Sequence, residues 1–183
     1  MDKRFRHAGV TLIEILVVVA LVAILQSLAV PSFAAMLNSA RMTMAVNSLF
    51  SSLLLARSEA IKRNARVVVC KSANGATCVT SGGWEQGWIV FHDANNNGAR
   101  DDGEDLVLQQ AALPSSIRFS GNSPVVNYIS YTPIGSASYT SGAFQAGTLT
   151  ACNVSATPVE ARQIVISSAG RPRTVKTLVD ECS

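Results

Sequence analysis

This sequence of 183 residues has few of the side chains on which enzymes and metal sites depend. It contains only two histidines, and charged residues make up 15% of it. His7 lies among the first basic residues, His92 stands alone beside a predicted strand, and no serine has a base paired with it. We therefore expect no catalytic activity and no cofactor.

Positive charge is also scarce once the first nine residues are set aside. The formal net charge is +3. Lys3, Arg4 and Arg6 outweigh Asp2 and contribute +2 of it, so the rest of the chain carries +1. This balance excludes a general attraction for polyanions, and any contact with nucleic acid must depend on a local patch.

Apolar residues are abundant near the start of the chain. Residues 15–25 form an uninterrupted apolar run after Glu14, and no small-residue cleavage site of a secretory signal closes it. A helix over residues 10–31 reaches the roughly 30 Å of a hydrocarbon core at about 1.5 Å per residue. The basic residues before it predict a cytoplasmic N-terminus and an exported head. We expect a single-pass membrane protein.

Past Pro31 the apolar pattern resumes at alternating steps of four and three, which predicts an amphipathic helix over residues 32–64. We expect Pro31 to kink the helix without ending it, because the pattern continues on both sides. The apolar stripe consists of Met42, Val46, Leu49, Leu53, Ala56 and Ala60, with Phe50 and Ile61 beside it. The polar face, which we interpret as a solvated surface, carries Arg41, Arg57, Lys62 and Arg63.

From residue 65 the chain turns to short runs rich in Val, Ile, Thr and aromatic residues, separated by turn formers. A sheet with one apolar face needs a cover, which the amphipathic half of the helix supplies. The predicted fold class is therefore α+β, with a long N-terminal helix packed on a β-rich head over residues 65–183. Strands are expected at residues 66–71, 87–92, 106–109, 117–119, 128–132, 148–152, 163–167 and 174–179. Residues 135–147 are expected to form a loop or a mobile hairpin, and Trp84 and Trp88 to pack in the core or on the sheet.

All four cysteines fall in the exported part, where thiols are oxidised. Three pairings are possible. We favour Cys70 with Cys78, which closes a short polar loop, and Cys152 with Cys182, which anchors the last residues. Free buried thiols are the alternative. The absence of a CxxC spacing and of a histidine near a cysteine pair argues against zinc.

The start of the chain resembles the N-terminus of type IV pilins and of the pseudopilins of type II secretion. The resemblance rests on the basic leader, Gly9, a carboxylate at the fifth following position and the apolar helix after it. It implies that residues 1–9 are a leader, that a prepilin peptidase cuts after Gly9, and that the new amine of Val10 is methylated. It also implies that the helix lies in the inner membrane and the head in the periplasm. Val10 departs from the usual phenylalanine there. In the family, the carboxylate at the position of Glu14 pairs with this amine on a neighbouring subunit as a filament assembles. The simpler alternative is that Glu14 sits at the lipid headgroups of an ordinary anchor.

The head resembles the FimT/GspH group of minor pilins and minor pseudopilins. This resemblance rests on three segments: Trp84-x-x-Gly87-Trp88-Ile-Val-Phe91-x-Asp93, Asp102-Gly-Glu104 and Gly170-Arg-Pro-Arg173. It implies a non-enzymatic minor pilin that partners other pilins, helps to initiate a pilus and lies near its tip. The alternative is a minor pseudopilin of a type II secretion system, partnered by other pseudopilins.

Gly170-Arg171-Pro172-Arg173 also resembles the motif through which FimT proteins contact DNA. The motif lies in a stretch without acids, residues 162–176. Guanidinium groups suit phosphate oxygens, so we expect weak, salt-sensitive and sequence-independent DNA binding that serves uptake in natural transformation. The residues expected to contact DNA are Arg162, Arg171, Arg173 and Lys176. The alternative is a plain hairpin turn with its arginines in solvent.

Residues 93–104 match the pattern of a calcium-binding EF-hand loop. The matching positions include Asp93, Asn95, Asn97 and Glu104. However, Arg100 stands where that loop carries an apolar residue, and the predicted flanking elements are strands instead of helices. Ordinary turn chemistry explains the same residues, so we predict no metal site and keep calcium as the lesser alternative.

Overall fold

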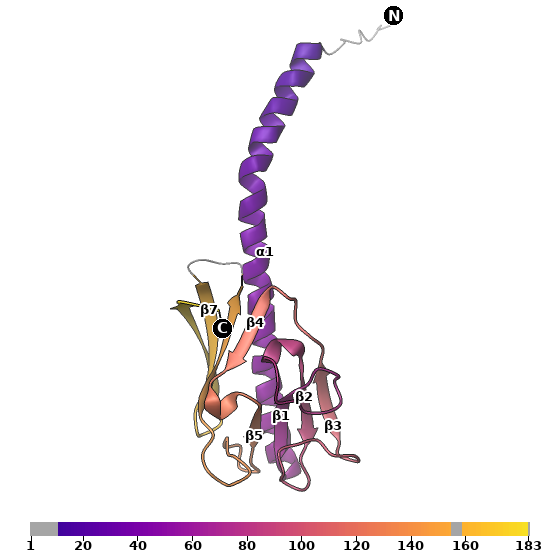
Figure 1. The fold of residues 1–183 in the computed structure, drawn as a ribbon, viewed down its shortest axis with the longest axis vertical. Helices are drawn as coiled ribbons and strands as arrows, with labels where there is room; N and C mark the ends of the chain where they lie inside the picture. Colours follow the sequence, from indigo (N-terminus) through magenta and orange to yellow (C-terminus); the bar gives the residue numbers. More distant parts are fainter. Residues whose placement is uncertain (1–10, 155–158, 183) are drawn as a thin grey trace, which may run out of the picture. The chain divides into compact units, whose positions relative to one another are not determined.

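A computed structural model describes residues 11–154 and 159–182 of the chain. The chain divides into two compact units, Met1–Ala40 and Arg41–Ser183. One helix, α1 (Leu12–Arg63), supplies most of the first unit and continues into the second (Figure 1). It passes through position 31 without interruption, so Pro31 does not end it, as predicted.

The end of α1 is set by Asn64. This residue adopts a left-handed backbone conformation with a φ of 50°, which asparagine tolerates better than most side chains. The N–H of Ala65 donates to the carbonyl of Ala60 at 3.2 Å, and the N–H of Asn64 donates to that of Ile61 at 3.3 Å. These two bonds form a Schellman motif, which satisfies carbonyls that the last turn would otherwise leave free.

The strands of the second unit form two antiparallel four-stranded sheets. The first has the order β3-β2-β1-β5 and the second the order β4-β6-β7-β8. Their bounds are β1 Val67–Lys71, β2 Trp88–His92, β3 Leu106–Gln110, β4 Ile117–Gly121, β5 Tyr128–Tyr131, β6 Gly147–Asn153, β7 Val159–Ile166 and β8 Pro172–Val179. All eight predicted strands are present, with β7 starting four residues earlier than predicted. Two short 3-10 helices, η1 (Trp84–Gln86) and η2 (Ser123–Val125), were not predicted.

The second half of α1 and both sheets share one hydrophobic core. The six residues of the predicted stripe are each at most 4% exposed. They pack with inward-facing side chains of both sheets, including Val69 and Tyr131 of the first sheet and Phe119 and Ile164 of the second. Truncating a buried leucine such as Leu49 or Leu53 to alanine typically costs about 2–5 kcal/mol. This stripe therefore holds the helix to the head.

Trp84 and Trp88 are core residues, as predicted. Both are fully buried, and each indole N–H has a partner. Trp84 donates to the carbonyl of Val125 at 3.1 Å, and Trp88 donates to the hydroxyl of Ser52 on α1 at 2.9 Å. The second bond places a polar residue inside the apolar stripe without leaving a buried donor unpaired.

The structure contains the two disulfides favoured from the sequence, Cys70–Cys78 and Cys152–Cys182. Cys70 belongs to a small cluster with Val68, Ile89 and Phe91, on the face of the first sheet opposite to the shared core. Its disulfide holds the following loop against that face. Cys182 comes after β8 and is tied to β6, so the second disulfide encloses the β7–β8 hairpin.

Of the two forms expected for residues 135–147, a loop or a mobile hairpin, the structure shows a hydrogen-bonded hairpin, over residues 132–146. Isolated bridges pair Tyr131 with Ala137 and Ser138 with Phe144. The fully buried Gln145 anchors the segment, because its side chain bonds to backbone groups of Pro124, Tyr128 and Ser130. An isolated glutamine among glycines and serines gave no sequence signal for this role.

Arg57 corrects the prediction of a fully solvated polar face on α1. Its side chain is half-buried, and its Nε donates to the carbonyl of Gly135 at 2.8 Å. Arg41 and Lys62 are exposed as predicted. Arg63 is exposed too, with ion pairs to Glu59 and Asp105. Arg57 thus joins α1 to the hairpin of residues 132–146.

Candidate functional sites

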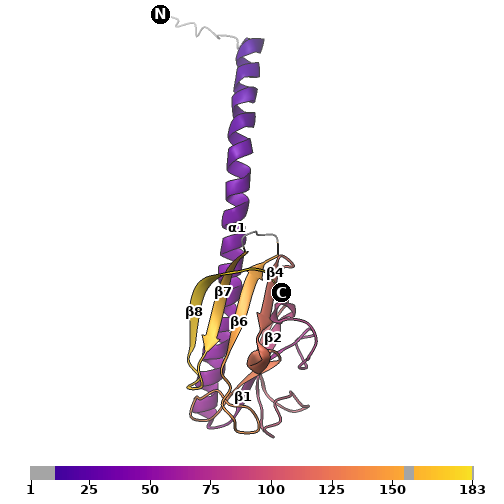
Figure 2. The ribbon, with the colours of Figure 1, turned by 60° about the vertical axis from the view of Figure 1, so that its left-hand side comes forward.

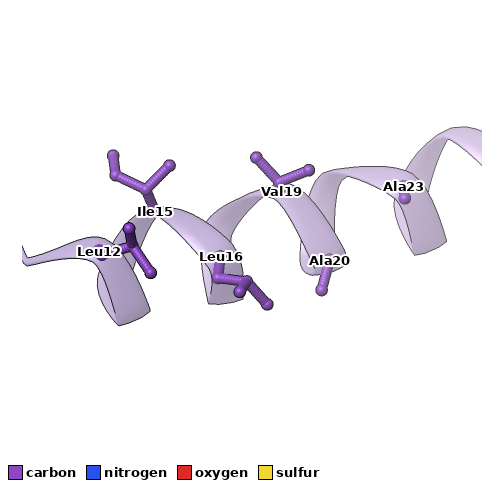
Figure 3. Close-up of a pocket in the computed structure, with 6 residues that line it drawn as sticks. All are labelled: Leu12, Ile15, Leu16, Val19, Ala20 and Ala23. Atoms are coloured by element: carbon purple, nitrogen blue, oxygen red, sulfur yellow. The ribbon is translucent and has the colours of Figure 1, made fainter.

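The first candidate site is the uncovered apolar surface of α1. Every residue from 11 to 27 is exposed, and the helix is long and apolar enough to cross a membrane. Figure 3 shows six alkyl side chains that follow one another along this part of the helix with no other element over them. They are Leu12, Ile15, Leu16, Val19, Ala20 and Ala23. An exposed apolar surface of this extent marks a site of contact with a membrane or with other protein.

Glu14 lies in the first turn of α1. Its carboxylate accepts the backbone N–H of Thr11 at 3.4 Å and lies 3.5 Å from the Thr11 hydroxyl. The N–H of Glu14 in turn donates to the carbonyl of Thr11 at 3.1 Å. This is one half of a capping box, and a carboxylate here also suits the positive end of the helix dipole. Gly9 and Val10, the predicted cleavage residues, lie outside the described part of the chain.

Thr11 is a residue that the sequence analysis missed. Thr11-Leu-Ile-Glu14 has the spacing of a capping box ahead of an apolar run, and this spacing could have identified it. The contact with Thr11 occupies only part of the hydrogen-bonding capacity of the Glu14 carboxylate. The carboxylate can serve the helix N-terminus and still present an oxygen to a cation that arrives beside Thr11.

The second candidate site is the turn between β7 and β8. Gly170 has a φ of 73° and is buried, and a Cβ on it would lie 2.2 Å from the carbonyl oxygen of Gly135. Only glycine fits this turn without strain. The N–H of Ala137 donates to the carbonyl of Ser168 at 3.3 Å, so the turn rests on the hairpin that Arg57 holds. Arg171 and Arg173 leave this supported turn with exposed side chains.

The structure does not bring all four predicted DNA-contacting residues together. Arg162 is directly opposite Lys176 in the β7–β8 ladder, whereas Arg173 is opposite Val165. Because successive side chains of a strand point to opposite faces, Arg162 and Lys176 share one face and Arg173 lies on the other. The first face also carries Ile164 and Ile166, which belong to the core shared with α1. Only Arg171 and Arg173 remain at the tip of the hairpin.

The loop with the calcium-site pattern is closed by its own hydrogen bonds. Asp93, 1% exposed, accepts the backbone N–H groups of Asn97 and Gly98, each at 3.0 Å. Glu104 accepts those of Ala94 at 2.8 Å and Asp101 at 3.1 Å. Within residues 11–154 and 159–182, no group of three or more His, Cys, Asp or Glu side chains is arranged to hold a metal.

The pKa values of two acids in this loop are shifted in opposite directions. Burial raises the pKa of Asp93, an effect that the N–H groups of Gly98 and Asn97 partly offset. The exposed Asp101 accepts the side-chain amides of Asn95 and Asn97, and these bonds lower its pKa. Burial thus dominates the shift of Asp93, whereas hydrogen bonds dominate that of Asp101.

Arg100 occupies the position that departs from the EF-hand pattern. Its guanidinium donates to the carbonyl of Ala76, in the loop closed by Cys70–Cys78, at 2.8 Å. It also donates to the carbonyl of Glu104 at 3.1 Å. Arg100 thus joins two neighbouring loops of the head.

Buried cations elsewhere have structural partners. Lys71, 1% exposed, donates to the carbonyls of Thr80 at 3.0 Å and Gly82 at 2.7 Å. Burial lowers the pKa of Lys71, and the charge of Glu85 opposes this shift. Glu85 itself accepts the N–H of Phe119 at 3.0 Å and pairs with Arg118 at 3.2 Å. Lys71 thus orders the loop before η1, and Glu85 joins η1 to β4.

Comparisons with known proteins agree with both resemblances noted in the sequence. A family model described as Type II transport protein GspH matches residues 45–170. A model described as Prokaryotic N-terminal methylation motif matches residues 4–29. A search of curated proteins found no match.

Solved structures of two relatives share the fold. The type IV minor pilin FimU of Pseudomonas aeruginosa is similar with a TM-score of 0.58 and 16% identity, covering 80% of this chain and 98% of that one. The minor pseudopilin EpsH from the Type 2 Secretion System of Vibrio cholerae is similar with a TM-score of 0.51 and 14% identity, covering 74% of this chain and 96% of that one.

These findings identify the architecture and the family together. The long N-terminal helix with its antiparallel β-rich head is the α+β fold predicted from the sequence. The GspH model covers more than half of the chain, and the methylation motif covers the start of α1. The chain therefore belongs to the GspH family of type IV pilin-like proteins.

Proposed function

We propose that this protein is a minor subunit of a type IV pilus, which enters the filament through the first part of α1 and takes part in pilus initiation. The observation that carries the proposal is the run of exposed apolar residues from 11 to 27, opened by one carboxylate. Lipid covers this surface before assembly, and the apolar helices of other pilins cover it afterwards. Incorporation near the tip fits a subunit that starts a fibre.

Glu14 supplies the specificity of this step. Cleavage between Gly9 and Val10 by a prepilin peptidase creates a cationic amine next to Thr11, the residue that already contacts the Glu14 carboxylate. An unpaired charge in an apolar environment is costly, and pairing between neighbouring subunits neutralises two charges in one contact. The geometry at Thr11 leaves the carboxylate at the helix end where such an amine arrives.

The test compares two substitutions at position 14. Glu14→Ala removes both the charge and the cap, whereas Glu14→Gln keeps an oxygen that accepts the Thr11 N–H and removes only the charge. We expect both variants to insert in the membrane, to be cleaved, and to be absent from sheared fibres, as measured by immunoblotting of membrane and fibre fractions. Normal incorporation of Glu14→Gln would contradict the charge pairing and would leave helix capping as the remaining role of the side chain at position 14.

We further propose that the hairpin tip contacts DNA through Arg171 and Arg173. Both side chains are exposed, and neither forms an ion pair among the described residues. The turn beneath them is fixed by Gly170 and the hairpin of residues 132–146, so the two guanidinium groups are presented from a supported backbone. Two arginines suit phosphate oxygens, and so few contacts predict weak, salt-sensitive binding. Arg162 and Lys176 face the other side of the hairpin, so the DNA contact is centred on the tip.

The DNA proposal is tested by a gel shift of the full-length protein in non-ionic detergent across a salt series. We expect Arg171→Ala/Arg173→Ala to abolish the shift at low salt. The matched control, Arg41→Ala/Lys62→Ala, removes two exposed cations of α1 and should retain it. Loss of the shift in the control, or an unchanged shift in the tip variant, would contradict a specific role for the tip.

A minor pseudopilin of a type II secretion system is the alternative, and the similarity to EpsH favours it. A strain lacking this gene distinguishes the two. The pilus role predicts fewer surface fibres and less DNA uptake with normal protein secretion. Impaired secretion with normal fibres would select the pseudopilin role.

A further inference from the structure

Arg162 and Lys176 form a directly opposed pair of like charges. They face each other across the β7–β8 ladder, on the face that also carries the core residues Ile164 and Ile166. Like charges directly opposite each other on one face destabilise a sheet. A bound anion between the two cations would remove this cost.

The protein itself does not provide a counterion in its described part. Neither Arg162 nor Lys176 forms a hydrogen bond from its side chain or an ion pair within residues 11–154 and 159–182. Glu160 lies on the same face two positions before Arg162, opposite Leu178, but it makes no ion pair with either cation. Arg162 is nevertheless half-buried, which makes an unneutralised charge more costly.

A cavity of about 270 Å³ opens beside the two cations, between them and α1. β8 is the edge strand of its sheet, as Figure 2 shows, so no further strand covers this side. The cavity is lined by Val46, Asn47, Arg162, Thr174, Val175 and Lys176. Its volume is roughly nine times that of a water molecule in the liquid, which suits a small ligand.

The lining residues favour an anion that carries two charges. Arg162 and Lys176 supply two positive charges, Asn47 and Thr174 supply neutral donors, and no acid lines the cavity. A carboxylate would leave one cation unmatched, whereas a phosphate monoester carries about 1.5 to 2 negative charges near neutral pH, and inorganic phosphate also supplies a dianion there. A guanidinium and an ammonium together recognise phosphate oxygens well.

We propose that this cavity is a binding site for a dianionic phosphate group, held between Arg162 and Lys176 and oriented by Asn47 and Thr174. The proposal does not depend on the DNA contact proposed for the hairpin tip, because the site faces the opposite side of the β7–β8 hairpin. Occupation of the site stabilises the ladder between the two strands by neutralising the opposed charges.

Thermal unfolding of the full-length protein in non-ionic detergent tests the site, with Trp84 and Trp88 as fluorescent reporters in the core. Inorganic phosphate is added at constant ionic strength, maintained with sodium chloride. We expect the midpoint to rise with phosphate and to saturate. In Arg162→Gln/Lys176→Gln the midpoint should not respond to phosphate. A wild-type response no larger than that to chloride would overturn the proposal.

Single substitutions give a signature that a purely structural role would not produce. Without phosphate, Lys176→Gln should leave the midpoint unchanged or raise it, because it relieves the repulsion from Arg162. With phosphate, the unfolding midpoint of the same variant should lie below that of the wild type. A lower midpoint in both buffers would contradict a phosphate site.

Two further arms test the position of the site and the charge of its ligand. Arg171→Gln/Arg173→Gln removes two cations from the tip and should leave the phosphate response intact. Dimethyl phosphate, a monoanion, should bind at least about tenfold more weakly than inorganic phosphate in calorimetric titration. Equal affinity, or loss of the response in the tip variant, would overturn the assignment.

Discussion

Tyr131 shows at the scale of a single residue how one buried polar atom affects stability. The side chain is fully buried in the core beside α1, and its hydroxyl has no hydrogen-bond partner among the residues that the structure describes. Burial raises the pKa of Tyr131, an effect that the charge of Arg57 only partly offsets. A buried hydroxyl without a partner costs roughly 1–3 kcal/mol in proteins.

We therefore expect Tyr131→Phe to stabilise the protein by about 1 kcal/mol, because it removes the unpaired hydroxyl and keeps the ring. The control is Tyr139→Phe, since the Tyr139 hydroxyl donates to the carbonyl of Pro124 at 3.1 Å and its loss should destabilise by about 1 kcal/mol. Urea unfolding followed by tryptophan fluorescence measures both. Destabilisation by Tyr131→Phe would reveal a partner for its hydroxyl.

An individual residue was predicted well where the backbone determined its role. The motif around Gly170 marked a turn, and the structure gives the reason in a positive φ and a close approach to Gly135. The bonds of Arg57 and Gln145 were not predictable. Each depends on a carbonyl or an N–H about 15 to 80 positions away in the chain, which no local pattern specifies.

At the scale of elements, the two disulfides constrain loops of different length. Cys152–Cys182 spans 30 positions and encloses the β7–β8 hairpin, whereas Cys70–Cys78 spans 8 and closes one loop. In the chain-entropy account, a cross-link stabilises more when the loop is longer. The estimate is about 3.5 kcal/mol for the longer loop and about 2.5 kcal/mol for the shorter one.

We expect Cys152→Ala/Cys182→Ala to lower the free energy of unfolding by about 1 kcal/mol more than Cys70→Ala/Cys78→Ala. The two pairs are a fair comparison because Cys70 and Cys152 are both almost completely buried. Urea unfolding under non-reducing conditions measures the difference. A larger loss in the Cys70 and Cys78 variant would show that packing of the short loop outweighs chain entropy.

Elements with a strong period were predictable from sequence. The helical stripe from Met42 to Ala60 recurs at the helical period over several turns, so its burial followed directly. The strands were found because β-branched residues alternate with turn formers. For residues 135–147 the sequence left open a loop or a mobile hairpin, since the order of the hairpin comes from Gln145 and from contacts with β5 and not from its own composition.

At the scale of the whole molecule, the second unit consists of the latter part of α1 and two sheets that both pack on it. The sequence analysis predicted one sheet with a helical cover, and the structure divides the strands into two sheets that pack on the same stripe. Strand pairing depends on which distant segments meet. The local pattern predicts a strand but does not choose its neighbour.

The sequence by itself determined the parts of this protein that depend on neighbouring residues. These are the apolar helix with Glu14, the amphipathic stripe, the eight strands and the family, because period, composition and short motifs are local properties. Only the tertiary structure decided how the cations of the head are distributed. The register of β7 and β8 places Arg162 opposite Lys176 on the face toward α1. Arg173, three positions before Lys176, lies on the other face because side chains alternate along a strand, and Arg171 lies in the turn before β8.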